Sequence, residues 1–434
     1  MTDLQIGFAG FAFIVFLIGL RVPVGLALIL VALAGISFVT SPETALALLR
    51  FIPFDFIANW DLSAVPMFLL MGAIAHHSGM TENLFSVARL WFSGLPGGLA
   101  VATNFACAGF SSASGSSLAT SMAVGRITIP EMRRHGYDNG LACGVVACGG
   151  TLGVLIPPSI ILVIYGILAE VSVAKLFIAG ILPGILTALV YAAQIMIRCA
   201  VNPALAPKIE EEITWKQRFA ALPAVWPLVV LILTIIGSIY TGVATPTEAG
   251  ALGAFLSIVI ATLQGRMSLS AFRQAARESA GATAAIFFVA IGAVLLTRFM
   301  AFSGVPQFLG EFVTTYGVGV IEIVLLCLVI YLVLGMFVDP MGMMLLTLPI
   351  LLPMLNAANL DLIWFGILVV KFIEIGLITP PVGLNVYAVK LIDPDIPLGS
   401  IFRGALWFLM SEAVVITLLI AFPVITLFLP QFLS

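Results

Sequence analysis

Apolar runs long enough to cross a membrane recur along the whole sequence, and this feature decides what the chain can fold into. Of its 434 residues, 62% are hydrophobic and 9% are charged, whereas soluble domains carry about 25% charged residues. About 20 consecutive apolar residues in helical conformation cross a bilayer core. The sequence therefore predicts an all-α polytopic membrane protein, and nothing in it indicates a nucleic-acid partner.

The residue types that bind transition metals are scattered. The cysteines lie in apolar segments without zinc or redox spacing, which favours buried small hydrophobic side chains. They are Cys107, Cys143, Cys148, Cys199 and Cys327. The three histidines, His76, His77 and His135, do not complete a metal site with them. We expect no transition metal, no cofactor and no enzymatic activity.

Basic residues cluster at 126–134, 198–218 and 266–277. The positive-inside rule places all three segments in the cytoplasm, and tracing the spans from them puts both termini in the periplasm. The segment 207–218 alternates in charge, which is typical of an amphipathic surface helix or of a solvated linker.

A weak internal repeat appears when the chain is shifted by 223 residues. GVLIPP at 153–158 then falls on GLITPP at 376–381, Pro130 falls on Pro353, and Ser116 falls on Asp339. The basic segments make the first interrupted stretch enter from the cytoplasm, and an odd number of crossings makes the second enter from the periplasm. Two such halves of opposite orientation are typical of inverted-repeat secondary transporters.

The stretch GFSSASGSSLATS at 109–121 predicts a re-entrant helical hairpin over 100–125. Irregular chain at membrane depth must be buried in protein or line a cavity, because unsatisfied backbone groups in lipid cost about several kcal/mol each. Glycine permits a tight turn there, hydroxyls and carbonyls offer oxygen ligands, and helix N-termini attract anions. The alternative is small-residue packing between straight helices.

Asp339 lies inside an apolar stretch, where an ionised carboxylate costs at least about 2.5 kcal/mol. It therefore suggests a bound cation such as Na+, with Ser116 at the equivalent place, or else a protonated Asp that caps a helix. The Pro-Pro breaks free carbonyl groups that complete such sites. Lys371 and Glu374 lie one helical turn apart and can pair. That pair suggests either structural neutralisation or a gating or substrate role. TPTEAG at 245–250 predicts a capping box that begins a helix.

The chain resembles, over its whole length, the large membrane subunit of tripartite ATP-independent periplasmic (TRAP) transporters. The motifs are SASGSS, LGVLIPPS at 152–159, GVATPTEAG at 242–250, MFVDP at 336–340 and GLITPPVGLNVY at 376–387. The resemblance implies an elevator-type, Na+-coupled importer of a small organic acid in the bacterial inner membrane. It also implies two partners, a small four-helix membrane subunit and a periplasmic substrate-binding protein.

The resemblance further implies Na+ ligands, with the serine register open by a residue or two. They are Ser114, Ser116, Thr151, Gly153, Asp339, Thr379, Pro380 and Gly383. Asn385, Lys371 and Glu374 are candidates for substrate contact or gating. Ile156 stands where the second break has Thr379, so the two sites are chemically unequal.

We expect scaffold helices over 1–99 and 222–317, transport repeats over 100–198 and 318–403, an amphipathic linker over 199–221 and a C-terminal helix over 404–434. Three other functions compete with this interpretation. A stand-alone anion carrier of related fold would need no binding protein. A membrane-embedded enzyme would need paired aspartates or HExxH, which the sequence lacks. A channel would need a repeated pore-lining ring.

Overall fold

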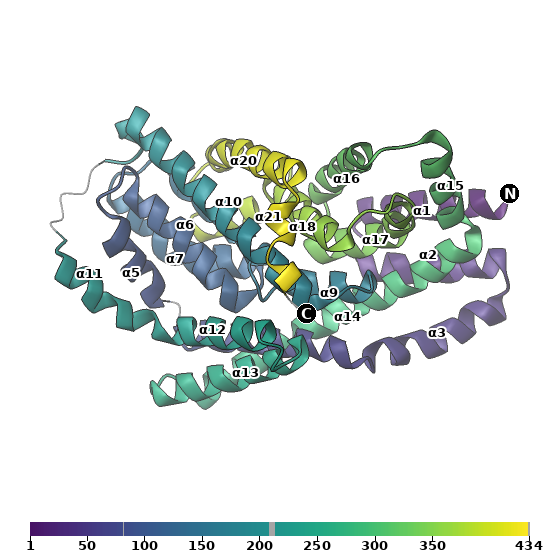
Figure 1. The fold of residues 1–434 in the computed structure, drawn as a ribbon, viewed down its shortest axis with the longest axis horizontal. Coiled ribbons are helices and arrows are strands. Elements are labelled where there is room, and N and C mark those ends of the chain that lie inside the picture. The colour runs from purple at the N-terminus through teal and green to yellow at the C-terminus, as the bar shows by residue number, and fades with distance from the viewer. Residues whose placement is uncertain (81, 208–212, 433–434) are drawn as a thin grey trace.

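The computed structural model describes residues 1–80, 82–207 and 213–432, and these residues form helices joined by turns, with no strand among them. The molecule is elongated, with α1 (Asp3–Gly19), α2 (Val24–Val39) and α3 (Pro42–Ile57) gathered toward one end (Figure 1). Toward the other end lie α5 (Glu82–Phe92) and α11 (Trp215–Ala221). The structure is therefore all-helical, as the sequence predicts.

The order of elements in the first half recurs in the second half. The first half continues through α4 (Ala64–His77), α6 (Gly98–Ser114), α7 (Ser117–Arg134), α8 (Asn139–Leu155), α9 (Ile160–Leu168) and α10 (Val173–Val201). The second half comprises α12 (Trp226–Tyr240), α13 (Pro246–Leu263), α14 (Leu269–Ser303), α15 (Val305–Tyr316), α16 (Val320–Gly335), α17 (Pro340–Ala357), α18 (Leu362–Ile378), α19 (Leu384–Ile392) and α20 (Leu398–Ala421). Short elements complete the chain: η1 (Trp60–Ser63), η2 (Pro203–Leu205), η3 (Leu222–Val225), α21 (Val424–Leu427) and η4 (Pro430–Phe432).

The structure confirms the repeat that the sequence predicts. Both ends of α7 and α17 differ by 223 residues, from 117 to 340 and from 134 to 357, and both ends of α8 and α18 do the same. One pair of elements differs between the halves. The first half has α3 and α4 with a bend of 58° between them, whereas α14 is one helix of 35 residues. Pro53 lies inside α3, close to that bend.

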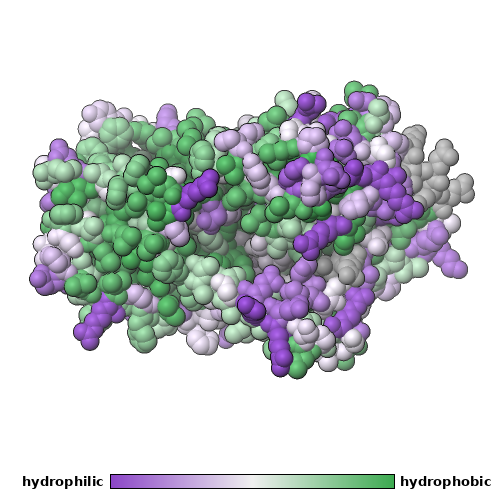
Figure 2. Space-filling model, turned by 180° about the vertical axis from the view of Figure 1, so that it is seen from behind, coloured by the Kyte–Doolittle hydropathy of each residue, from purple (hydrophilic) through white to green (hydrophobic). Residues whose placement is uncertain are grey.

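Helices of membrane-spanning length and composition confirm a multi-pass membrane protein. Six described segments qualify, or up to eight if each bent pair is one span. They are Val173–Val201, Trp215–Tyr240, Pro246–Leu263, Leu269–Ser303, Pro340–Ala357 and Leu398–Ala421; the bent pairs are α3 with α4 and α8 with α9. Figure 2 shows a broad apolar surface over the half that carries the N-terminal helices, with hydrophilic residues gathered on the other half.

Local capping confirms one predicted helix start. At α13 the Thr245 N–H donates to Glu248 Oε2 at 2.8 Å, and the Glu248 N–H donates back to Thr245 Oγ1 at 3.3 Å. This is the reciprocal capping box predicted for TPTEAG.

Two expected boundaries lie elsewhere in the structure. α10 runs to Val201, past the expected end at 198, because a helix accepts Arg198 in its last turn. The C-terminal helix begins at Leu398 and ends at Ala421, before Pro423, and does not extend over 404–434 as one element.

The linker of the sequence analysis is partly helical. Of its residues, 208–212 lie outside the described part of the chain, and α11 follows them. The Arg218 guanidinium lies 4.7 Å from the centre of the Trp215 ring, and Phe219 packs edge-on against Trp91 of α5. Within this segment, α11 is therefore a short helix packed against the first half.

Candidate cation and substrate site

The first hairpin turns at Gly115. α6 ends at Ser114, Gly115 has a φ of +59°, which a residue with a Cβ rarely adopts, and Ser116 caps α7 by accepting from the Ala119 N–H. Thr120 Oγ1 lies 2.9 Å from Ser114 Oγ and donates to the Ser116 carbonyl at 2.8 Å. This confirms the helical hairpin with a Ser/Gly tip.

The hairpin tip packs directly against the first Pro-Pro break. A Cβ on Gly153 of α8 would lie 3.0 Å from the Ser116 carbonyl oxygen, and a Cβ on Gly115 would lie 3.0 Å from the Pro158 carbonyl oxygen. Two glycines therefore permit this close approach. It brings Ser114, Ser116 and Gly153 into one region rich in neutral oxygens.

Thr120 also belongs to this first region, although it is absent from the sequence prediction. Its position one helical turn after Ser116 is the sequence feature that could have indicated it. Thr151 is buried on α8, and its hydroxyl donates to the Cys148 carbonyl at 2.7 Å, within its own helix.

The second hairpin joins α16 and α17 through residues 336–339. The Asp339 side chain caps α17 by accepting from the Gly342 N–H at 3.1 Å, and Asp339 is exposed in the protein chain. This is the capping geometry that the sequence analysis gives as the alternative to cation binding. The hairpin approaches α18 at a pair of glycines, since a Cβ on Gly376 would lie 2.7 Å from the Gly335 Cα.

The second break lies between α18 and α19. The Thr379 hydroxyl donates to the Ile375 carbonyl at 2.6 Å, and Gly383, with a φ of +58°, precedes α19. Thr379 and Pro380 are half-buried. Among the described residues no hydrogen bond joins Asp339 to this break.

Three predicted substrate or gating residues are fully buried. Asn385 of α19 donates to the Ala147 carbonyl of α8 at 3.1 Å, which ties the second break to the first half. Lys371 and Glu374 form the predicted pair, with Nζ to Oε2 at 2.5 Å, and Glu412 of α20 joins them. Glu412 is absent from the sequence predictions, although an isolated carboxylate in an apolar span is a signal for it.

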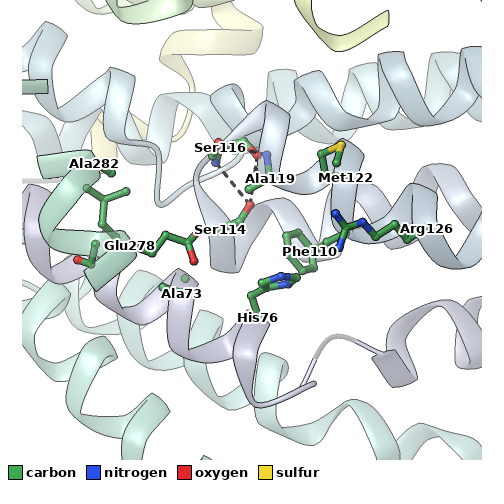
Figure 3. Close-up of a pocket in the computed structure, with 14 residues that line it drawn as sticks. Ala73, His76, Phe110, Ser114, Ser116, Ala119, Met122, Arg126, Glu278 and Ala282 are labelled. Carbon is green, nitrogen blue, oxygen red and sulfur yellow. Dashed lines mark hydrogen bonds between the residues drawn. The ribbon is translucent and has the colours of Figure 1, made fainter. Parts of the chain in front are cut away.

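A cavity of about 270 Å³ lies between the first hairpin and the helices α4 and α14. Figure 3 shows Ser114 and Ser116 together with Phe110, Arg126, His76 and Glu278 around it. Arg126 makes no ion pair within the part of the chain that the structure describes, whereas Glu278 lies 2.8 Å from His77. The site residues predicted from the sequence do not include Arg126, His76 or Glu278.

The chemistry of this region suits two kinds of ligand. Hydroxyl and carbonyl oxygens at the first tip are hard donors that suit an alkali or alkaline-earth cation. The Arg126 guanidinium, which projects from the middle of α7, suits a carboxylate. In the described residues no group of three or more His, Cys, Asp or Glu side chains could hold a metal ion, and the five cysteines are buried and unbonded.

The sequence matches a family profile over residues 11–425, described as the tripartite ATP-independent periplasmic transporter, DctM component. The chain belongs to this family. It is 37% identical over 384 residues to the C4-dicarboxylate TRAP transporter large permease protein DctM of Pseudomonas aeruginosa, covering 88% of each chain. It is 31% identical to the sialic acid TRAP transporter large permease protein SiaM of Vibrio cholerae, covering 94% of this chain and 95% of that protein.

The fold has a counterpart among solved structures. The Alcanivorax borkumensis YdaH transporter superposes with a TM-score of 0.59 over 88% of this chain and 90% of its own, at 14% identity. This likeness shows the fold alone. The family is one of transporter permeases in the membrane, and its description as one component of a tripartite system implies further subunits.

Proposed function

We propose that this protein is the large permease of a Na+-coupled importer of a small organic acid. It works with a small four-helix membrane subunit and a periplasmic substrate-binding protein. The observation that carries the proposal is the cavity where the Arg126 guanidinium and the oxygens of the first hairpin tip face the same space. The anion site and the cation site therefore lie next to each other on the first hairpin, which moves during transport.

Arg126, in the middle of α7, binds a carboxylate of the substrate. A guanidinium donates two parallel hydrogen bonds to a carboxylate. The relatives named above are named for C4-dicarboxylate and for sialic acid, which are acids. Glu278 lines the opposite wall and lies 2.8 Å from His77, so the positive charge that attracts the anion is supplied by Arg126.

One Na+ binds to the neutral oxygens of Ser114, Ser116 and Thr120, together with carbonyl oxygens at the first Pro-Pro break. Asp339 supplies the formal negative charge for a second Na+. Cation binding orders the tips, and the loaded hairpin region then slides against the scaffold as an elevator. The basic segment that begins at Arg126 faces the cytoplasm and both termini face the periplasm, so the cavity opens inward. The membrane potential contributes about 2.3 kcal/mol per charge per 100 mV.

Reconstitution tests the proposal. Proteoliposomes that hold this chain and its small membrane subunit are offered labelled organic acids, with and without an inward Na+ gradient and with and without the binding protein. Uptake that needs both supports the proposal. Na+-driven uptake without the binding protein supports the stand-alone carrier instead, and uptake indifferent to Na+ contradicts the cation sites.

Arg126→Gln tests the substrate site in the same liposomes. We expect KM for the acid to rise about 10- to 100-fold with Na+ dependence unchanged, since a hydrogen bond to a charged group is worth about 1.5–3 kcal/mol. Arg273→Gln is the matched control, because Arg273 is exposed on α14 outside the cavity. Equal KM values in the two variants would contradict the assignment.

A further inference from the structure

Three charged side chains meet in the interior, away from the cavity and both hairpin tips. Lys371 and Glu374 lie on α18, Glu412 lies on α20, and none of the three is exposed. The Lys371 ammonium donates to Glu374 Oε2 at 2.5 Å and to Glu412 Oε1 at 2.8 Å. It also donates to Thr187 Oγ1 of α10 at 3.3 Å. All three donors of the ammonium are therefore used.

The two carboxyl groups of this Lys–Glu–Glu cluster have different surroundings. Glu412 accepts from Lys371 and from the Tyr191 hydroxyl, which is the pattern of an ionised carboxylate. Glu374 accepts from Lys371 alone, and its Oε1 is buried without a hydrogen-bond partner among the described residues. Glu412 Oε2 also lacks such a partner there, but it lies 2.8 Å from the ammonium. Glu374 thus has the weaker support for a negative charge.

The charges of the cluster balance only if it binds one proton. With both carboxyl groups ionised, the interior would hold one uncompensated negative charge, which is strongly unfavourable. We propose that Glu374 is a proton-binding site whose Oε1 carries a proton while the cluster is closed. When movement of the hairpin region admits water, the O–H bond breaks, the proton passes to water and Glu374 is left as a carboxylate. This assigns H+ as a second ion that influences transport, beside Na+.

The titratable groups around the cluster are few. Tyr191 faces it from α10, and Cys148 faces Tyr191 and Glu412 from α8. Four other titratable or charged groups on helices packed against α18 have partners elsewhere. Tyr331 of α16 bonds Thr347 of α17, Tyr165 of α9 bonds the Leu362 carbonyl, Lys390 of α19 bonds the Ile396 carbonyl and Arg198 of α10 stacks over Trp407 of α20. Glu374 is therefore the group in this region that the charge balance requires to be protonated.

The position of the cluster connects it to the moving parts. Glu374 lies on the last turns of α18, and the next residue, Ile375, supplies the carbonyl that accepts from Thr379 at the second break. Thr187 and Tyr191 belong to α10, which packs against α6, α8 and α20. A change of charge at Glu374 therefore acts on a helix that ends at the second break.

Infrared spectroscopy of the full chain in liposomes detects a protonated carboxylic acid directly. We expect the wild-type protein at neutral pH to show the C=O band of a protonated carboxylic acid, which Glu374→Gln removes. Glu248→Gln is the matched control, because Glu248 caps α13 outside the cluster. Glu412→Gln leaves one ammonium with one carboxyl group, so that variant also lacks the band and serves if Glu374→Gln fails to fold. Identical spectra for the wild-type protein and both cluster variants would overturn the proposal.

The pH dependence of uptake at a fixed Na+ gradient measures the effect of this proton on transport. Wild-type uptake should fall about tenfold for each pH unit above the midpoint of Glu374, since one proton is lost. Glu374→Gln should transport with no such fall, because the amide mimics the protonated acid. Equal pH profiles for the wild-type protein and this variant would overturn the role in transport. The infrared result stands without any uptake, so failure of the proposed function is distinguishable from failure of this inference.

Discussion

The two hairpin tips occupy equivalent places in the repeat but differ in packing. At the first tip, Ser114 is buried between α4 and α8, and Gly72 and Gly153 allow both helices to touch the backbone of the tip. At the second tip, Asp339 is exposed, and its side chain accepts the capping hydrogen bond from the Gly342 N–H. The breaks differ in the same sense, because Pro157 and Pro158 are buried whereas Pro381 is exposed.

The repeat therefore fixes the backbone of the two tips but not the chemistry of the side chains that they carry. Ile156 packs against Gly184 of α10, so the first break contributes carbonyls and no hydroxyl at that position. The first site is therefore made of neutral dipoles already packed together. In the second site the charge is that of one carboxylate, Asp339, which is exposed in the described chain. We infer that the first site is preorganised and that the second is completed by movement.

The largest effect on this comparison is expected from Asp339→Asn. Asparagine caps a helix as well as aspartate does, so folding and insertion should be unchanged. If Asp339 binds Na+, loss of the charged oxygen should lower Na+ affinity about 10- to 100-fold, from about 1.5–3 kcal/mol. The measurement is the Na+ concentration for half-maximal uptake. Wild-type Na+ dependence in this variant would leave Asp339 as a cap and nothing more.

A smaller effect is expected from Gly153→Ala. The new methyl group would press on the Ser116 carbonyl oxygen at 3.0 Å and on Thr120 Oγ1 at 3.1 Å. Overpacking of this kind costs about 1–3 kcal/mol, and we expect about a tenfold loss of Na+ affinity with a lowered melting temperature. Gly281→Ala is the control, because a Cβ there meets nothing within 4 Å. If both glycine variants behave alike, the first tip is not preorganised by this contact.

Much of the fold could be predicted because the residues that interrupt its helices can be recognised in the sequence. Gly115 and the two Pro-Pro pairs mark the hairpin and the interrupted helices, and the shift of 223 residues gives matching bounds for α7 and α17. Contacts between distant elements have no such signal. Glu412 meets Lys371 across 41 residues, and Arg126 faces a cavity whose opposite wall is α14. Those depend on how helices pack, which side-chain spacing along one chain does not encode.

The smallest effect is expected from Ser116→Ala, the counterpart of the change at Asp339. The substitution removes the capping hydroxyl of α7, which accepts from the Ala119 N–H at 3.4 Å, and such a cap is worth about 0.5–2 kcal/mol. The Ser116 carbonyl, which meets Gly153 and accepts from Thr120, remains in place. Na+ affinity should therefore fall only a few-fold, measured as for Asp339→Asn. A loss as large as that of Asp339→Asn would mean that the Ser116 hydroxyl, and not the Ser116 carbonyl, is the ligand. The contrast between the neutral, preorganised first tip and the charged, exposed second tip would then depend on their side chains alone.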